Sequence, residues 1–278
     1  MRINLKSTIT VAALSISVWF SGSALANSEL GDDKQSLVFG VVPQQSAAKL
    51  ARQWGPLLKA WSDVTGIDMR FATARDIPTF EERLAAGEYD IAYMNPYHFT
   101  LVNQTPGFTA LARAKDKRIT GIMVAKKGWQ GDVEDLNNAS LAFPAPRAFA
   151  ASILTQSELR QKGLSITPNY VGAHDSVYMA VAKGIYPAGG GVMRTFNSLD
   201  ESIKKQLTII YRTNSYTPHA IAFSDNLDEV TALKLKQSLK PLNQNAEAQA
   251  MFEQLSIKGL EPAKDSDWDD VVALDIKL

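Results

Sequence analysis

The chain has 278 residues, and its 29 basic and 29 acidic side chains give a formal net charge of zero. The chain therefore lacks the cationic excess that would indicate binding to nucleic acid or to an anionic membrane surface. The absence of cysteine excludes disulfides, thiolate nucleophiles and cysteine-based metal sites. A chain of this length must then be held together by its hydrophobic core, and it is long enough for one or two α/β lobes.

The first residues have the features of a secretory signal peptide. Arg2 and Lys6 precede a mostly apolar run over residues 9–20, and Ala24-Leu25-Ala26 matches the A-x-A cleavage pattern. The run is shorter than the about 20 apolar residues that a membrane-spanning helix needs. We predict cleavage after Ala26 and a periplasmic protein, with an uncleaved anchor as the alternative. A lipid-anchored form is excluded because no cysteine is present.

Beyond this segment, short apolar runs alternate with helix-periodic segments. We expect strands at 36–42, 67–71 and 89–93 and helices at 47–65 and 77–86, with Asp76 as a cap of the second helix. The order strand, helix, strand, helix, strand predicts parallel pairing with right-handed crossovers.

A second series of elements follows two connecting strands, at 108–114 and 119–126. In this part we expect strands at 140–143, 168–172, 184–188, 207–212 and 220–223, helices at 149–161, 175–182, 226–239, 246–255 and 267–274, and a flexible break at Gly189-Gly190-Gly191. The pattern predicts an α/β protein of two lobes. Residues 27–118 together with 217–278 form the first lobe, and residues 119–216 form the second. A cleft between lobes is a common ligand site, and hinge closure around a ligand is an established motion.

One stretch, residues 89–99, joins a buried strand to a helix. Asn95-Pro96 ends the strand, because proline cannot donate to a sheet but fits the first turn of a helix. Tyr93, Tyr97 and His98 lie at this junction. Open α/β sheets bind ligands at the carboxyl ends of their strands, so these side chains are candidates for a binding site. The alternative interpretation is that both tyrosines belong to the core.

Several short motifs occur in an order that is typical of one family. They are residues 39–43 (FGVVP), 89–93 (YDIAY), Asn95-Pro96, Gly172-Ala173-His174 and Thr217-Pro218. Together they resemble the phosphate/phosphite/phosphonate-type periplasmic substrate-binding proteins of ABC transporters, the phosphonate-binding family. The resemblance covers nearly all of the chain after residue 26. It implies a two-lobed type II periplasmic binding protein fold with the ligand in the cleft between the lobes.

The resemblance also implies ligand-binding residues. Tyr93 matches a tyrosine that faces the cleft, and His174 matches a histidine at a helix start in the second lobe. Ser46 lies near the first-lobe loop at the ligand, although capping of the next helix explains it equally well. Tyr97 and Tyr216 are further candidates around the predicted cleft. We expect no cofactor and no metal. A site built from the three histidines is the less favoured alternative, because no two of them share a helical i, i+3 or i+4 spacing.

The loop before the helix at 149–161 departs from the family. Where phosphonate binders carry a run of serine and threonine, this chain has Arg147, Ala148, Phe149 and Ala150. The helix N-terminus would still bind an anion through backbone N–H groups, and Arg147 would add a guanidinium. A second departure is the triple glycine at 189–191, where an aminoalkyl phosphonate would meet an acidic residue in the family. An aminoalkyl ligand is therefore not expected.

We predict a monomeric, non-enzymatic solute-binding protein that captures a small oxyanion or organic anion of the phosphonate or phosphate class for an ABC permease. The alternative is a ligand-sensing accessory protein for a membrane histidine kinase. A hydrolase is less favoured, because no G-x-S-x-G, H-E-x-x-H or G-x-x-x-x-G-K-[ST] motif occurs. Nothing in the sequence brings Ser46, His174 and Asp175 together as a triad.

Overall fold

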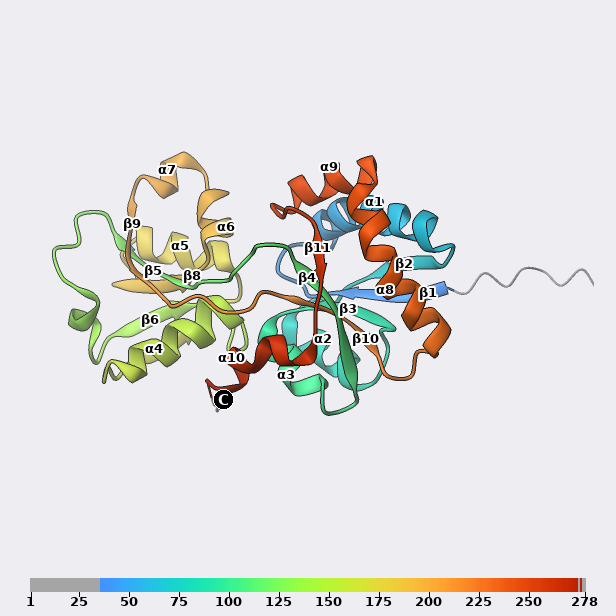
Figure 1. Ribbon diagram of the computed structural model, residues 1–278. Coiled ribbons are helices and arrows are strands. Elements are labelled where there is room, and N and C mark those ends of the chain that lie inside the picture. The colour runs from blue at the N-terminus through green and yellow to red at the C-terminus, as the bar shows by residue number, and fades with distance from the viewer. Residues whose placement is uncertain (1–35, 275, 277–278) are drawn as a thin grey trace, which may run out of the picture. The chain divides into compact units, whose positions relative to one another are not determined.

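Two β-sheets organise the computed structural model, which describes residues 36–274 and 276. The predicted signal peptide and its cleavage site lie outside the described residues. Both sheets are mixed and both have helices on each face, which confirms the predicted α/β class (Figure 1). None of the helices in the described part of the chain has the length and apolarity needed to cross a membrane.

The first sheet contains six strands in the order β11-β4-β10-β3-β1-β2. The strand β1 pairs in parallel with β2 and β3, as the sequence predicted, and β10 enters antiparallel between β3 and β4. The bounds are β1 (Ser36–Val41), β2 (Asp68–Ala72), β3 (Ile91–Met94), β4 (Phe108–Ala114), β10 (Ala220–Ser224) and β11 (Leu260–Pro262). The short strand β11 was not predicted.

Two groups of helices cover the first sheet, each over its own hydrophobic cluster. One group is α1 (Ala47–Thr65), α8 (Glu229–Gln244) and α9 (Ala246–Gln254), and the other is α2 (Ile77–Ala85), α3 (Pro96–Val102), η3 (Asp265–Trp268) and α10 (Asp269–Val272). Side-chain caps fix the starts of five of these helices. Backbone amides of α1, α2, α3, α8 and α9 donate hydrogen bonds to the side chains of Ser46, Asp76, Asn95, Asp228 and Asn245. Pro96 occupies the first turn of α3, as predicted.

The second sheet contains five strands in the order β7-β6-β8-β5-β9. Its strands are β5 (Ile122–Lys126), β6 (Ser140–Phe143), β7 (Thr167–Tyr170), β8 (Ala188–Gly191) and β9 (Leu207–Arg212). Its helices are η1 (Val133–Leu136), η2 (Phe149–Leu154), α4 (Thr155–Gln161), α5 (His174–Ala182), α6 (Met193–Asn197) and α7 (Glu201–Lys204). The predicted helix at 149–161 is therefore a π-helical segment, η2, that continues as α4.

The triple glycine is a strand and not a flexible break, so this prediction is wrong. Gly189, Gly190 and Gly191 are buried in β8, between β6 and β5, and the strand predicted at 184–188 is displaced toward them. A Cβ atom at Gly190 would lie 2.0 Å from the carbonyl oxygen of Ala151, and one at Gly191 would lie 2.1 Å from the Tyr178 hydroxyl. The glycines are required because helices η2 and α5 approach the strand this closely.

The chain passes between the two sheets twice, once after β4 and once after β9. The two passing segments are joined by an antiparallel bridge between Ile119 and Tyr216, and Figure 1 shows them side by side. Residues of the first sheet fall within 36–114 and 220–262, and those of the second within 122–212. The lobe boundaries at 118/119 and 216/217 stay a prediction, and this topology agrees with them.

Candidate functional site

Three adjoining hollows are lined by residues from the segments that build the first and the second sheet. The Tyr93 cavity has a volume of about 180 Å³. The helix-start cavity, named for the start of η2, has about 20 Å³, and the His174 groove is open and has about 690 Å³. Gln44, which follows β1 at the carboxyl end of the first sheet, lines all three. This is the position at which α/β sheets bind ligands.

The helix-start cavity is formed by the first turn of η2. The amides of Ser152 and Ile153 both donate to the carbonyl of Ala148, at 2.7 and 3.3 Å. The residues between Ala148 and Ser152, Phe149 to Ala151, line the cavity. The first N–H groups of a helix have no partner within the helix. They give the cavity wall a positive partial charge without any charged side chain. Segments of π-helix are frequent at functional sites.

His174 lies at the first position of α5 and lines both the helix-start cavity and the His174 groove. Its Nδ1 atom is buried and has no hydrogen-bond partner within the described residues. Burial lowers the pKa of the imidazole to about 4, although the negative charge of Asp175 acts in the opposite direction. At neutral pH the ring is therefore uncharged and offers one N–H donor and one acceptor.

Tyr93 lies in β3 and lines the Tyr93 cavity with its ring between two other rings. Its centroid is 4.6 Å from that of Trp54 and 5.0 Å from that of His219, with which it is nearly parallel. Burial raises the pKa of the Tyr93 phenol to about 12, so the hydroxyl keeps its proton. Gln44 Nε2 lies 2.8 Å from His219 Nε2 and donates to it, which requires this imidazole nitrogen to be unprotonated.

The predicted ligand residue Arg147 does not line any of the three hollows. Its guanidinium forms an ion pair with Glu81 of α2, at 2.5 Å between Nη1 and Oε2. The second oxygen of this carboxylate lies 2.8 Å from Nε2 of the buried His98. The backbone carbonyl of Arg147 accepts a hydrogen bond from Asn95 Nδ2 at 3.2 Å. Arg147 thus connects the loop before η2 to the helices beneath the first sheet.

Replacing Arg147 with alanine is expected to lower the free energy of unfolding by at most about 1 kcal/mol, because the side chain is 44% exposed and water screens its ion pair. Urea denaturation would measure this change. Lys59→Ala is a matched control, because it removes an exposed ion pair with Asp63, at 2.6 Å, that lies within the single helix α1. A loss above about 2 kcal/mol for Arg147 alone would show that its ion pair behaves as a buried one.

Of the other predicted residues, Ala148, Phe149 and Ala150 line the helix-start cavity and Ser46 lines the His174 groove. Ser46 also caps α1, since its Oγ accepts from the amide of Lys49 at 3.4 Å. Tyr97 and Tyr216 are buried in the hydrophobic cluster below the sheet and line none of the hollows. The ring of Tyr216 packs edge-on against Phe149, with the centroids 6.4 Å apart.

Three residues at the hollows were missed by the sequence analysis. Gln44 and Lys117 were not among the predicted ligand-binding residues, although Gln44 lines all three hollows and Lys117 lines the Tyr93 cavity. Arg194 follows the triple glycine and lines the Tyr93 cavity from α6. The available signal was the position of Gln44 shortly after β1, a buried parallel strand. Among the described residues, no group of three His, Asp or Glu side chains has the geometry of a metal site.

The comparisons with known proteins identify the family. Residues 39–268 match the profile of the family described as "ABC transporter, phosphonate, periplasmic substrate-binding protein". A curated relative, the phosphate-import protein PhnD of Mycolicibacterium smegmatis, is 21% identical, and the alignment covers 85% of this chain and 82% of that protein.

Two solved structures share the fold at 16% identity. A binding protein component of an ABC phosphonate transporter from Pseudomonas aeruginosa superposes with a TM-score of 0.77, covering 87% of this chain and 86% of that one. PhnD1 from Prochlorococcus marinus, in complex with methylphosphonate, also gives 0.77 and covers 87% of this chain and 97% of that one. These likenesses confirm the type II periplasmic binding protein fold. The family profile spans most of the sequence, and the chain belongs to the periplasmic substrate-binding proteins of phosphonate ABC transporters.

Proposed function

We propose that this chain binds a small phosphonate or phosphate-like oxyanion at the helix-start cavity and presents it to an ABC permease. The observation that carries the proposal is the wall of this cavity. It combines the first turn of η2 with His174, Gln44 and Asn95, and it contains no carboxylate. Backbone N–H groups at a helix start are a common anion site. The neutral imidazole of His174 adds one hydrogen-bond donor. No carboxylate lines the cavity, so no negative side chain in its wall repels the anion.

The volume of this cavity indicates that the ligand enters by a conformational change. About 20 Å³ accommodates little more than one water molecule, which is less than a phosphonate group needs. The elements that enclose it come from both sheets, and the bridge between Ile119 and Tyr216 lies where the chain passes between them. We expect the two lobes to rotate apart about these passing segments to admit the ligand and then to close over it, as in other hinge proteins.

The names of the relatives support the choice of ligand class. PhnD of Mycolicibacterium smegmatis is named a phosphate-import protein, and PhnD1 of Prochlorococcus marinus was solved with methylphosphonate. An aminoalkyl phosphonate fits less well, because none of the residues that line the helix-start cavity or the Tyr93 cavity is acidic. The ammonium group would leave water without a carboxylate to replace its hydration.

Titration calorimetry and thermal shift with methylphosphonate, phosphite, phosphate, sulfate and 2-aminoethylphosphonate would test the proposal. A ligand that binds only the folded state raises the melting temperature. We expect methylphosphonate, phosphite or phosphate to bind, and His174→Ala to weaken that binding by about tenfold, because it removes a donor at the ligand. The matched control is Ser176→Ala, in the same first turn of α5 but outside the three hollows.

Absence of stabilisation by every anion of this panel would contradict the proposed ligand class. Equal loss of affinity in the His174 and Ser176 variants would contradict the proposed position.

We further propose that the chain is a monomer that performs no catalysis, and that residues 1–26 direct its export and are removed. Light scattering and the N-terminal sequence of the exported protein would test the first and last of these statements.

A further inference from the structure

The Tyr93 cavity is a second chamber next to the proposed anion site, and its composition differs. Most of its wall is apolar or aromatic. These lining residues belong to or pack against one hydrophobic cluster and are Trp54, Leu57, Tyr93, Leu255, Ile257 and Leu260. Its volume of about 180 Å³ is sufficient for a ring, since a cavity of about 150 Å³ accommodates benzene. A bare oxyanion would leave most of this apolar wall without a partner.

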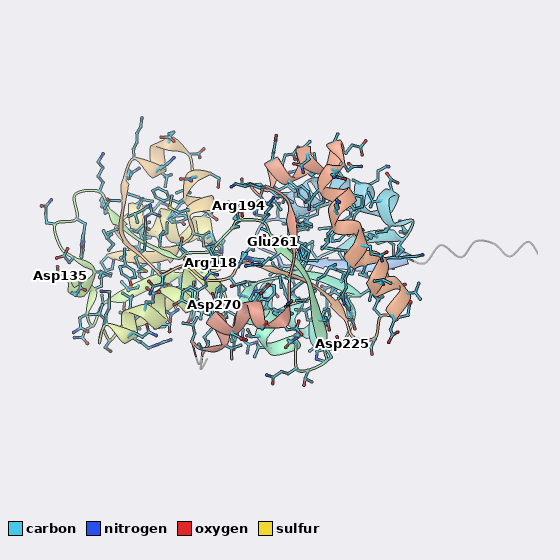
Figure 2. All side chains as sticks on the ribbon, in the orientation of Figure 1. Arg118, Asp135, Arg194, Asp225, Glu261 and Asp270 are labelled. Atoms are coloured by element: carbon cyan, nitrogen blue, oxygen red, sulfur yellow. The ribbon has the colours of Figure 1, made fainter. Side chains whose placement is uncertain are left out.

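Three cationic side chains line the same cavity, and no acidic side chain does. Arg118 is already neutralised, because its Nη2 lies 2.8 Å from Asp270 Oδ2 (Figure 2). Lys117 donates from Nζ to the carbonyl of Ser256 at 2.8 Å, a neutral acceptor. Arg194, on α6, has no ion pair or side-chain hydrogen bond within residues 36–274 and 276. Lys117 and Arg194 therefore leave positive charge at an apolar chamber.

We infer that the Tyr93 cavity binds an organic anion with an apolar body, such as an aryl or branched alkyl carboxylate. The body lies against Trp54, Leu57 and Leu255, and the carboxylate lies near Lys117 and Arg194. This inference goes beyond the proposed function, because it assigns a different ligand class to a different chamber. The two chambers share Gln44, Ile119, Val192 and His219 in their walls. The start of η2 and His174 line the helix-start cavity and do not line the Tyr93 cavity.

The ligand class follows from two separate requirements. The apolar wall favours a buried hydrocarbon group, whose affinity grows with the apolar area removed from water. The unpaired cations favour a negative head and disfavour a positive one, because like charges in a partly buried site repel. A ligand of the same shape without charge should meet only the first requirement. A small anion without the apolar group should meet only the second.

Calorimetric titration with four probes separates these requirements: phenylacetate, phenylacetamide, 2-phenylethylamine and acetate. We expect phenylacetate to bind at least about tenfold more tightly than acetate, because the ring is buried. It should also bind more tightly than the neutral amide, and the amine should bind most weakly of the three ring compounds. Arg194→Gln should weaken phenylacetate by about fivefold and leave phenylacetamide unchanged. Lys117→Gln should have an effect in the same direction.

The matched control is Arg212→Gln, which removes the same charge from an exposed residue of β9 outside the cavity. Equal effects of the Arg194 and Arg212 variants, equal affinity for acetate and phenylacetate, or no phenylacetate binding to the folded protein would overturn the inference. Loss of phenylacetate binding in His174→Ala would also overturn it, because the ligand would then lie in the helix-start cavity. Binding of phenylacetate without any phosphonate or phosphate would instead sustain this inference and contradict the proposed function.

Discussion

Replacing Gly190 with alanine is expected to lower the free energy of unfolding by about 3 kcal/mol, the upper part of the range for overpacked cores. The new Cβ would lie 2.0 Å from the carbonyl oxygen of Ala151 and 2.7 Å from the ring of Phe143. A backbone oxygen cannot rotate out of the way as a side chain can. Either β8 or the start of η2 must therefore shift. Urea denaturation at neutral pH would measure the loss of stability.

Gly55→Ala is the matched control for this substitution. Gly55 lies inside α1, and a Cβ there meets no atom within 4 Å apart from its chain neighbours and the backbone of its own helix. Alanine is the better helix former, but Pro56 disfavours the helical conformation of a non-glycine residue that precedes it. The two effects offset each other, so this variant should change the free energy of unfolding by less than about 1 kcal/mol. The same chemical change is thus expected to cost far less at Gly55 than at Gly190. If Gly190→Ala is as stable as the original protein, the close approach of η2 to β8 does not exist in solution.

Acidification is expected to destabilise the protein between about pH 6.5 and pH 3, with His219 as a principal cause. The side chain is 8% exposed, and burial together with the positive charges of His98, Lys117 and Arg194 lowers its pKa to about 3. Below pH 6.5 the unfolded chain binds a proton that the folded chain does not. The free energy of unfolding then falls by at most about 1.4 kcal/mol per pH unit for this group until the folded pKa is reached.

His219→Gln removes this titrating group and should flatten the dependence of stability on pH over the same interval. Urea denaturation at pH 7, 6, 5 and 4.5 would give the two slopes. Hydrogen bonds with Thr79 lower the pKa of Asp76, so protonation of this and similar carboxylates on acidification also lowers the free energy of unfolding. It does so in both proteins, so the difference between the slopes isolates His219. Identical slopes would mean that His219 is protonated normally in the folded protein.

Much of the fold followed from local sequence patterns. Strand 108–114 was predicted with its observed bounds, and Asp76 and Pro96 were placed correctly at the starts of α2 and α3. These signals are local, because a cap or a proline acts on its own turn. The triple glycine was misread for the opposite reason. Its strand conformation depends on contacts with helices η2 and α5, and no pattern within residues 189–191 reveals these contacts.

The candidate site was less accessible to prediction. Tyr93 and His174 line the hollows as the family resemblance implied, although their contact with a ligand stays a prediction. Arg147 was expected at the ligand because of its charge, but Glu81 satisfies that charge from α2. No pattern within either segment indicates this pair, since 66 residues separate its partners. Arg194 and Lys117 likewise meet at one cavity only through the arrangement of the two sheets.

The order of strands along the chain has a consequence for folding during secretion. Residues 122–212 supply every strand of the second sheet, so a nascent polypeptide can complete that sheet as soon as Arg212 has crossed the membrane. The first sheet has to wait, because its middle strand β10 and its edge strand β11 come last. Until they arrive, β4 has no neighbour and one edge of β3 is open. Unpaired edges of this kind promote aggregation, so the amino-terminal half needs protection while the remainder is exported.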